Sequence, residues 1–125
     1  MNNFLYVFLG SGLGGCLRYG LMLGLRKYNF ILPIHTLFAN VIACLFLGLT
    51  MGYLMQHTQN SSLKFILAIG ICGGLSTYSS FSYEVIQQME SGDWLNVFIY
   101  SLGTFILCLL CILLGLWIVK TGFKF

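Results

Sequence analysis

The sequence predicts an all-α integral membrane protein, with four transmembrane helices in one domain over residues 1–125. Of the 125 residues, 58% are hydrophobic and only 7% are charged, whereas soluble domains carry about a quarter charged residues. A spanning helix needs about 20 largely apolar residues. The chain therefore has room for four such helices with short loops, and a soluble domain does not fit alongside them.

The first apolar segment runs from about residue 4 to residue 25 and is expected to be a retained helix, because no basic region and no small-residue cleavage site mark it as a signal peptide. Arg18 lies inside it, where a guanidinium costs at least about 2.5 kcal/mol unless it faces water or a partner. Arg18 either reaches the membrane surface as an anchor or lines a wet vestibule that attracts anions. Small-xxx-small pairs, which permit close helix packing, are Gly10 and Gly14, Gly20 and Gly24, and, in the next segment, Gly48 and Gly52.

The second apolar segment runs from about residue 31 to residue 55, and Pro33 suits its first turn. Thr36 and Asn40 are four residues apart and share a helix face, with Asn40 deep in the apolar run. An amide at that depth either hydrogen-bonds another helix or meets a passing solute, and both interpretations stay open. His35 lies one residue off this face and is interpreted as interfacial.

The third segment, about residues 63–88, contains the stretch GGLSTYSSFSYE at 73–84. Glycines are weak helix formers and Ser or Thr can hydrogen-bond local backbone groups, so we expect a break near the middle of this helix. Such a break at membrane depth must be buried in protein or border water. The carbonyl groups freed between Gly73 and Ser76 need partners, and a bound cation is the natural one. Beyond the break, one face of the helix carries Thr77, Tyr78, Phe81 and Glu84. If only two of these features were present, a stripe of aromatic residues that serves packing would be the preferred interpretation.

The fourth segment runs from about residue 94 to residue 119 and carries one narrow stripe of polar and sulfur-bearing side chains. By itself this stripe is as compatible with packing as with a pore lining. All five cysteines lie inside apolar segments, and their odd number and burial argue against a disulfide framework. Cys108 and Cys111 form a C-x-x-C without a second pair or a nearby histidine, so they are interpreted as packing residues.

Basic residues are balanced between the two sides of the predicted bundle. Orientation in a membrane normally follows an excess of Lys and Arg on the cytoplasmic side, and three basic residues against three leave no excess. We therefore expect insertion in both orientations and assembly as an antiparallel pair. The first side has Lys64, Lys120 and Lys124, and the second has Arg18, Arg26 and Lys27.

The stretch at 73–84, together with GGCLRY at 14–19 and TLFAN at 36–40, resembles the Fluc (CrcB) fluoride channels, whose third helix carries GGL-[ST]-T-F-S-x-F-S-x-E. The resemblance covers the whole chain. It implies a fluoride-selective channel in a bacterial inner or plasma membrane that exports fluoride and confers fluoride resistance. It also implies a dual-topology homodimer with two pores and a central structural Na⁺, held by the carbonyls of Gly73 and Ser76 from both subunits.

The resemblance also implies which side chains meet fluoride. Tyr78 departs from the phenylalanine usual at the first aromatic position, and it keeps an electropositive ring edge that can face an anion while adding a hydroxyl. The implied pore residues are Asn40, Thr77, Tyr78, Ser79, Ser80 and Phe81. The implied pathway or vestibule residues are Arg18, Thr36, Glu84, Tyr100 and Thr104.

Two other functions remain open on the sequence alone. A small proton-coupled multidrug or cation transporter is also a four-helix, dual-topology design, but it needs a membrane carboxylate and Glu84 is the one candidate. A non-transporting subunit that packs through its glycine faces would leave the polar break unexplained. An enzyme is not expected, because no nucleophile–base pair and no cluster of metal ligands is found, and the expected partners are fluoride, a second copy of the chain and lipid, with no nucleic acid.

Overall fold

The computed structural model describes residues 2–28, 32–57 and 61–122, and every regular element in these ranges is helical. The prediction of an all-α protein is confirmed. Ile31, the expected start of the second segment, and Lys124 lie outside the described residues. The elements are α1 (Asn2–Leu25), α2 (Ile34–His57), α3 (Ser61–Leu63), the π-helix η1 (Lys64–Cys72), α4 (Gly73–Leu75), α5 (Tyr78–Glu90) and α6 (Trp94–Gly122).

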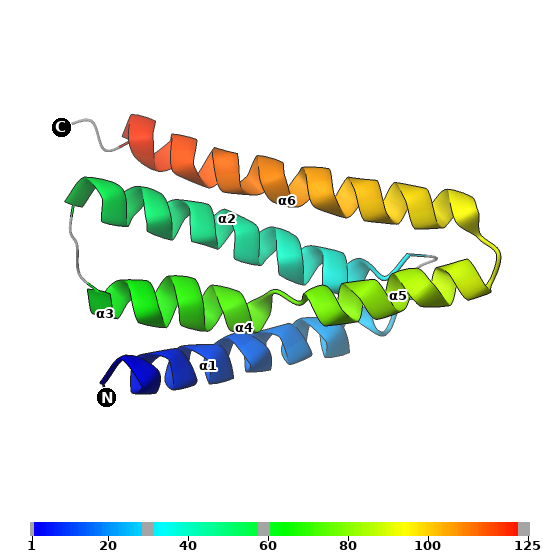
Figure 1. Cartoon of the computed structure of the whole chain (residues 1–125), viewed down its shortest axis with the longest axis horizontal. Helices are drawn as coiled ribbons and strands as arrows, with labels where there is room; N and C mark the ends of the chain where they lie inside the picture. Colours follow the sequence, from blue (N-terminus) through cyan, green and yellow to red (C-terminus); the bar gives the residue numbers. More distant parts are fainter. Residues whose placement is uncertain (1, 29–31, 58–60, 123–125) are drawn as a thin grey trace.

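The helices form an elongated antiparallel bundle whose two termini lie at the same end (Figure 1). The row of α3, η1, α4 and α5 acts as one long third rod. Helix α2 lies between this rod and α6, while α1 lies on the other side of the rod. The chain therefore runs along the long axis of the bundle four times, in alternating directions.

The third rod is interrupted between α4 and α5. Ser76 (φ −75°, ψ 152°) and Thr77 (φ −149°, ψ 117°) have extended backbones, whereas Gly73, at the start of α4, is still helical. Before the interruption, η1 is wound as a π-helix of nine residues. Two extended residues between helices leave backbone groups without their usual helical partners, and neighbouring side chains must supply them.

Three helical stretches in the described part of the chain are long and apolar enough to cross a membrane: Ile34–Gln56, Lys64–Glu90 and Trp94–Gly122. Helix α1 does not meet that criterion because Arg18 and several glycines lower its mean hydropathy. Its 24 residues are nevertheless about 36 Å long at 1.5 Å per residue, which exceeds the hydrocarbon thickness of about 30 Å. Its outer side is apolar, with Phe4, Leu5, Phe8, Leu9, Leu13 and Leu17 exposed.

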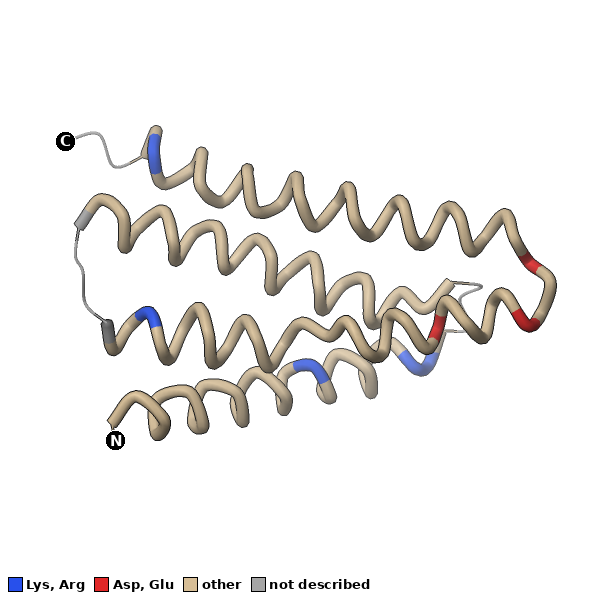
Figure 2. Tube along the Cα trace, viewed as in Figure 1, with Lys and Arg blue, Asp and Glu red and all other residues tan. Residues whose placement is uncertain are grey.

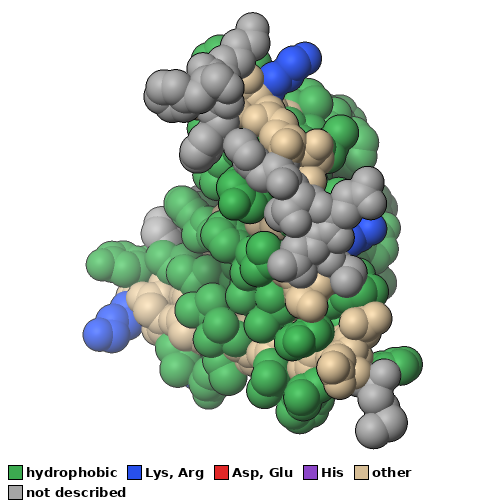
Figure 3. Space-filling model, turned by 90° about the vertical axis from the view of Figure 1, so that its left-hand side faces the viewer, with side chains coloured by type: hydrophobic (Ala, Val, Ile, Leu, Met, Phe, Trp, Pro, Cys, Tyr) green, Lys and Arg blue, Asp and Glu red, His purple; other side chains and the backbone are tan. Residues whose placement is uncertain are grey.

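Charge is distributed unequally between the two ends of the bundle. Lys and Arg occur towards both ends, whereas Asp and Glu occur only towards the end that holds the α5–α6 loop (Figure 2). The opposite end shows a largely hydrophobic face with basic side chains at its margins and no acidic side chain in view (Figure 3). Most of the length between the ends is uncharged, as the interior of a membrane requires.

Glycine contacts set how the helices lie against one another. A Cβ added at Gly10 would come 2.9 Å from the Gly70 Cα, and one at Gly14 would come 2.8 Å from the Leu75 nitrogen. A Cβ at Gly48 would likewise lie 3.1 Å from the Gly115 Cα. The expected close packing of these glycine pairs is therefore found for α1 against η1 and α4, and for α2 against α6. Among the described residues, Gly20 and Gly24 have no such neighbour.

Candidate functional site

The interruption in the third rod is held by one side chain of α2. The Thr77 N–H donates to Asn40 Oδ1 at 2.7 Å, and Asn40 Nδ2 donates to the Thr77 carbonyl at 3.3 Å. Both residues are buried, with 8% exposure each. The amide thus supplies a partner to each backbone group of Thr77 at a point where lipid could not supply one.

Thr77 also caps the helix that follows the interruption. Its Oγ1 accepts from the Ser80 N–H at 3.2 Å, which is the usual role of a threonine at an N-cap. In an unbroken helix the Thr77 N–H would donate to the Gly73 carbonyl, and the Ser80 N–H to the Ser76 carbonyl. Since both N–H groups are engaged elsewhere, the carbonyls of Gly73 and Ser76 lose these two donors.

Arg18 extends from α1 to the same interruption. Its Nη1 lies 3.4 Å from the Ser76 carbonyl oxygen in a partly buried position. The guanidinium is therefore directed into the bundle beside the break. The guanidinium also lines a cavity that reaches the break.

Glu84 on α5 receives hydrogen bonds from two other helices. Thr36 Oγ1 donates to Oε1 at 2.5 Å, and the Tyr100 hydroxyl of α6 donates to Oε2 at 2.7 Å. His35 Nε2 lies 3.3 Å from the same Oε1. Only 13% of the Glu84 side chain is exposed, and this carboxylate is the point at which α2, α5 and α6 meet through polar groups.

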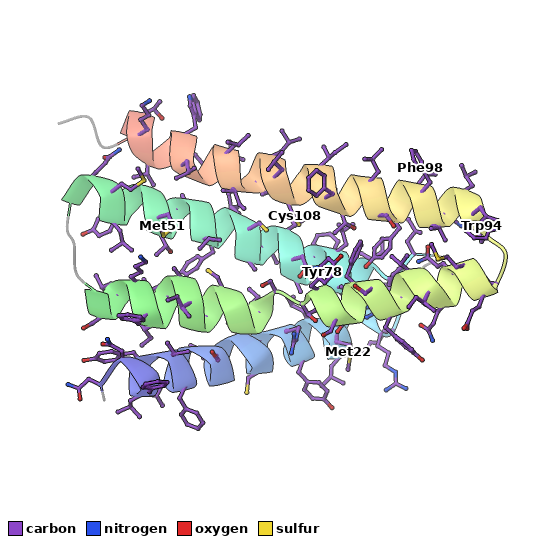
Figure 4. The ribbon with its side chains drawn as sticks, in the orientation of Figure 1. Met22, Met51, Tyr78, Trp94, Phe98 and Cys108 are labelled. Carbon is purple, nitrogen blue, oxygen red and sulfur yellow. The ribbon has the colours of Figure 1, made fainter. Side chains whose placement is uncertain are left out.

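Three aromatic rings form a row next to this carboxylate. The ring centroids of Tyr78 and Phe81 are 5.8 Å apart, and those of Phe81 and Tyr100 are 5.3 Å apart, with tilts of 42° in both pairs. Such tilted pairs direct the electropositive edge of one ring towards a neighbour. Tyr78, at the start of α5 beside the interruption (Figure 4), is 80% exposed, so its ring lies on the uncovered side of the chain.

The remaining predicted hydroxyls lie in two places. Ser79 is exposed and Ser80 partly buried, and their Oγ atoms lie 3.2 Å and 3.1 Å from Thr77 Oγ1, so the three hydroxyls form one cluster. Thr104 lies one turn after Tyr100 on α6 and is 7% exposed. Among the described residues, its Oγ1 is buried without any hydrogen-bond partner. An unpaired buried hydroxyl costs about 1–3 kcal/mol, so the position is unfavourable for folding alone.

Two adjoining cavities of about 550 Å³ each lie between one end of the bundle and the interruption. The outer cavity is lined by Arg26 and Ser91, near the ends of α1 and α5. The inner cavity is lined by Arg18, Thr77 and Ser80, and so reaches the interruption. Residues on the wall common to both are Met22, Pro33, His35, Glu84 and Gln87.

His35 has no role in the site predicted from the sequence, which interprets it as interfacial. In the structure it contacts Glu84 and lines both cavities. One feature of the sequence pointed to His35: it is the neighbour of the predicted site residue Thr36, and both belong to the first turn of α2. Nothing in the sequence pairs that turn with α5, because the pairing depends on how the helices pack.

The cysteines take no part in this arrangement. All five are free, and only Cys16 is exposed. Within the described ranges no group of three His, Cys, Asp or Glu residues could hold a metal ion.

Comparison with known proteins gives a consistent result. The sequence model of the family described as CrcB-like protein, Camphor Resistance (CrcB), matches residues 5–116. Among similar proteins, one from Flavobacterium psychrophilum is 42% identical over 109 residues, covering 85% of this chain and 88% of its own length. One from Gloeothece citriformis is 36% identical over 124 residues (98% and 100%), and one from Phocaeicola vulgatus is 34% identical over 118 residues (94% and 98%). All three are named "Fluoride-specific ion channel FluC", and none is named as an enzyme.

Proposed function

The chain belongs to the CrcB family of multi-pass membrane proteins, which are ion channels and not enzymes, and on that premise we propose that it is a fluoride-selective channel. The resemblance expected from the sequence is confirmed at the level of the family. The proposed channel exports fluoride across a bacterial inner or plasma membrane down its electrochemical gradient and so confers fluoride resistance.

The observation that carries this proposal is the buried hydroxyl of Thr104, which has no hydrogen-bond partner among the described residues. Fluoride is small and strongly hydrated, so a selective path must replace its water with closely spaced donors that no single site dominates. Thr104 offers a free donor at low exposure. The proposed path continues past the aromatic edges of Phe81 and Tyr78 to the hydroxyl cluster of Thr77, Ser79 and Ser80.

Arg18 and Asn40 have supporting roles at this path. Arg18 is directed into the inner cavity, where its positive charge raises the local concentration of anions. Asn40 keeps the interruption open by holding both backbone groups of Thr77. Glu84, tied by Thr36 and Tyr100, fixes three helices around the entrance.

We infer further that a Na⁺ ion lies at the interruption, with the Gly73 and Ser76 carbonyls as ligands. These two carbonyls have lost their ordinary helical donors, and hard cations prefer oxygen ligands. The Ser76 carbonyl accepts a 3.4 Å contact from Arg18 Nη1 and keeps a second lone pair for the cation. The cation, when bound, would supply a fixed positive charge that orients the broken helices. The melting temperature of the purified protein should be higher in NaCl than in choline chloride at the same ionic strength, and equal values would contradict the site.

A second copy of the chain would complete this site. Gly73 is exposed, and a Cβ added there meets nothing within 4 Å among the described residues. Tyr78 and Tyr83 are 80% and 62% exposed on α5, which is a polar and aromatic surface at membrane depth. A second copy in the opposite orientation would cover it, giving two pores per antiparallel homodimer. Reporters fused to the C-terminus should then be found in both compartments, and a single orientation would argue against the pair.

The direct test is fluoride efflux from proteoliposomes, followed with a fluoride electrode and compared with chloride efflux. The expected result is rapid fluoride efflux that protein-free liposomes lack, with chloride retained. The runner-up function, proton-coupled export of cationic drugs, predicts dye efflux that depends on a pH gradient and no fluoride flux. Glu84 serves such a carrier poorly because three hydrogen-bonding side chains already surround it.

A further inference from the structure

The contact between His35 and Glu84 lies on the wall between the outer and the inner cavity. His35 Nε2 is 3.3 Å from Glu84 Oε1, and the two side chains are 38% and 13% exposed. Both residues line both cavities. The pair therefore stands where the two cavities adjoin, between the end of the bundle and the interruption.

Among the described residues, the imidazole of His35 is the basic group in direct contact with this carboxylate, whereas Arg18 and Arg26 line the cavities without touching it. Thr36 and Tyr100 donate hydrogen bonds to Glu84 but carry no positive charge. Arg18 is directed at the Ser76 carbonyl instead. Among residues 2–28, 32–57 and 61–122, the His35–Glu84 pair is the only basic–acidic contact within 4.0 Å.

We propose that His35 is a positioning residue that makes the entry of anions depend on pH. This inference rests on the proposed function as a fluoride channel. With a protonated imidazole, the pair is neutral overall and an anion crosses from the outer to the inner cavity. With a neutral imidazole, the carboxylate charge is uncompensated and repels the anion at the same point. Fluoride efflux is therefore fastest in mildly acidic solution and slower in mildly alkaline solution.

Other ionisable groups face the same space and must be separated from His35. Arginine and tyrosine side chains ordinarily hold one charge state from about pH 6 to pH 8, whereas histidine changes charge there. Substitution of His35 itself therefore isolates its effect from that of Glu84. The groups around the pair are Arg18 and Tyr19 from α1, Arg26 and Tyr28 after it, Tyr83 and Glu84 from α5, and Tyr100 from α6.

The test compares four proteins in fluoride-efflux assays at equal internal and external pH, from about pH 6 to pH 8, after subtraction of protein-free liposomes at each pH. The unmodified protein should lose flux by about fivefold as pH rises, since one uncompensated charge acts at close range. His35→Gln should show a flat profile at the low, alkaline level. His35→Lys, which keeps a positive charge, should show a flat profile at the high, acidic level. His57→Gln, which alters the histidine at the other end of α2, should keep the ordinary profile.

The outcomes separate this inference from the function on which it rests. A His35→Gln profile that follows the unmodified protein overturns the proton dependence and leaves the channel intact. A loss of flux in both His35 variants at every pH overturns it too, since that result assigns His35 to packing. If the unmodified protein releases no fluoride at any pH, the proposed function is wrong and this inference is wrong with it.

Discussion

Asn40 and Thr77 are joined by two hydrogen bonds, from the Thr77 N–H to Asn40 Oδ1 at 2.7 Å and from Asn40 Nδ2 to the Thr77 carbonyl at 3.3 Å. The two residues are 37 positions apart in the chain. The pair satisfies both backbone groups of Thr77 in a region where unpaired groups cost several kcal/mol. The interruption of the third rod is therefore fixed by α2, and a change at Asn40 acts on the backbone as well as on any passing anion.

Asn40→Asp should slow fluoride efflux by at least about tenfold. The carboxylate still accepts from the Thr77 N–H, but it cannot donate to the Thr77 carbonyl, and the loss of this hydrogen bond costs about 1–3 kcal/mol. It also adds a negative charge to the proposed path. Efflux from proteoliposomes and the melting temperature in detergent measure the two effects. Asn3→Asp, at an exposed position in α1, is the control. Faster efflux from Asn40→Asp would count against anion conduction.

Phe81→Ile should abolish fluoride efflux while leaving the proposed dimer intact. The substitution keeps an apolar side chain but removes the ring that lies between Tyr78 and Tyr100, and with it the electropositive edges. Size-exclusion chromatography checks assembly, and the fluoride electrode checks flux. Phe98→Ile is the matched control, because Phe98 is 64% exposed and points away from the bundle on α6 (Figure 4). Undiminished flux in Phe81→Ile would remove Phe81 from the pore.

Thr104→Val should lower fluoride efflux and leave the melting temperature unchanged or higher. Valine has nearly the same shape, and the Thr104 hydroxyl has no partner among the described residues, so its removal relieves a cost of about 1–3 kcal/mol. A hydroxyl that served folding would show the opposite pattern. Thr36→Val, which removes the donor to Glu84, should instead lower the melting temperature. Full flux in Thr104→Val would show that fluoride does not use this donor.

Gly14→Ala should destabilise the protein by about 1–3 kcal/mol, as overpacking of a close contact does. The added Cβ would lie 2.8 Å from the Leu75 nitrogen, immediately before the interruption, so α1 must move away from α4. Thermal unfolding in detergent measures the change. Gly12→Ala is the control, because a Cβ there meets nothing within 4 Å. Equal melting temperatures for the two variants would contradict the close packing of α1.

The sequence by itself predicted the helical membrane class, because an apolar composition and four long apolar segments leave few other folds. It also indicated the special stretch at 73–84, since glycines and hydroxyl residues oppose a regular helix wherever they stand. These are local properties of the chain. They depend on residue type and spacing, which are visible without a structure.

The tertiary structure decided which groups meet across helices. Whether Asn40 bonds a helix or faces a solute was open in the sequence, and the structure joins it to Thr77. Thr36 and Tyr100 both contact Glu84, and His35 joins them. The Thr104 hydroxyl has no partner in the part of the chain that the structure describes. The physical reason is that each pairing depends on the distance and register between helices. Backbone contacts at glycines such as Gly10 and Gly48 set that register, and only a packed bundle brings them together.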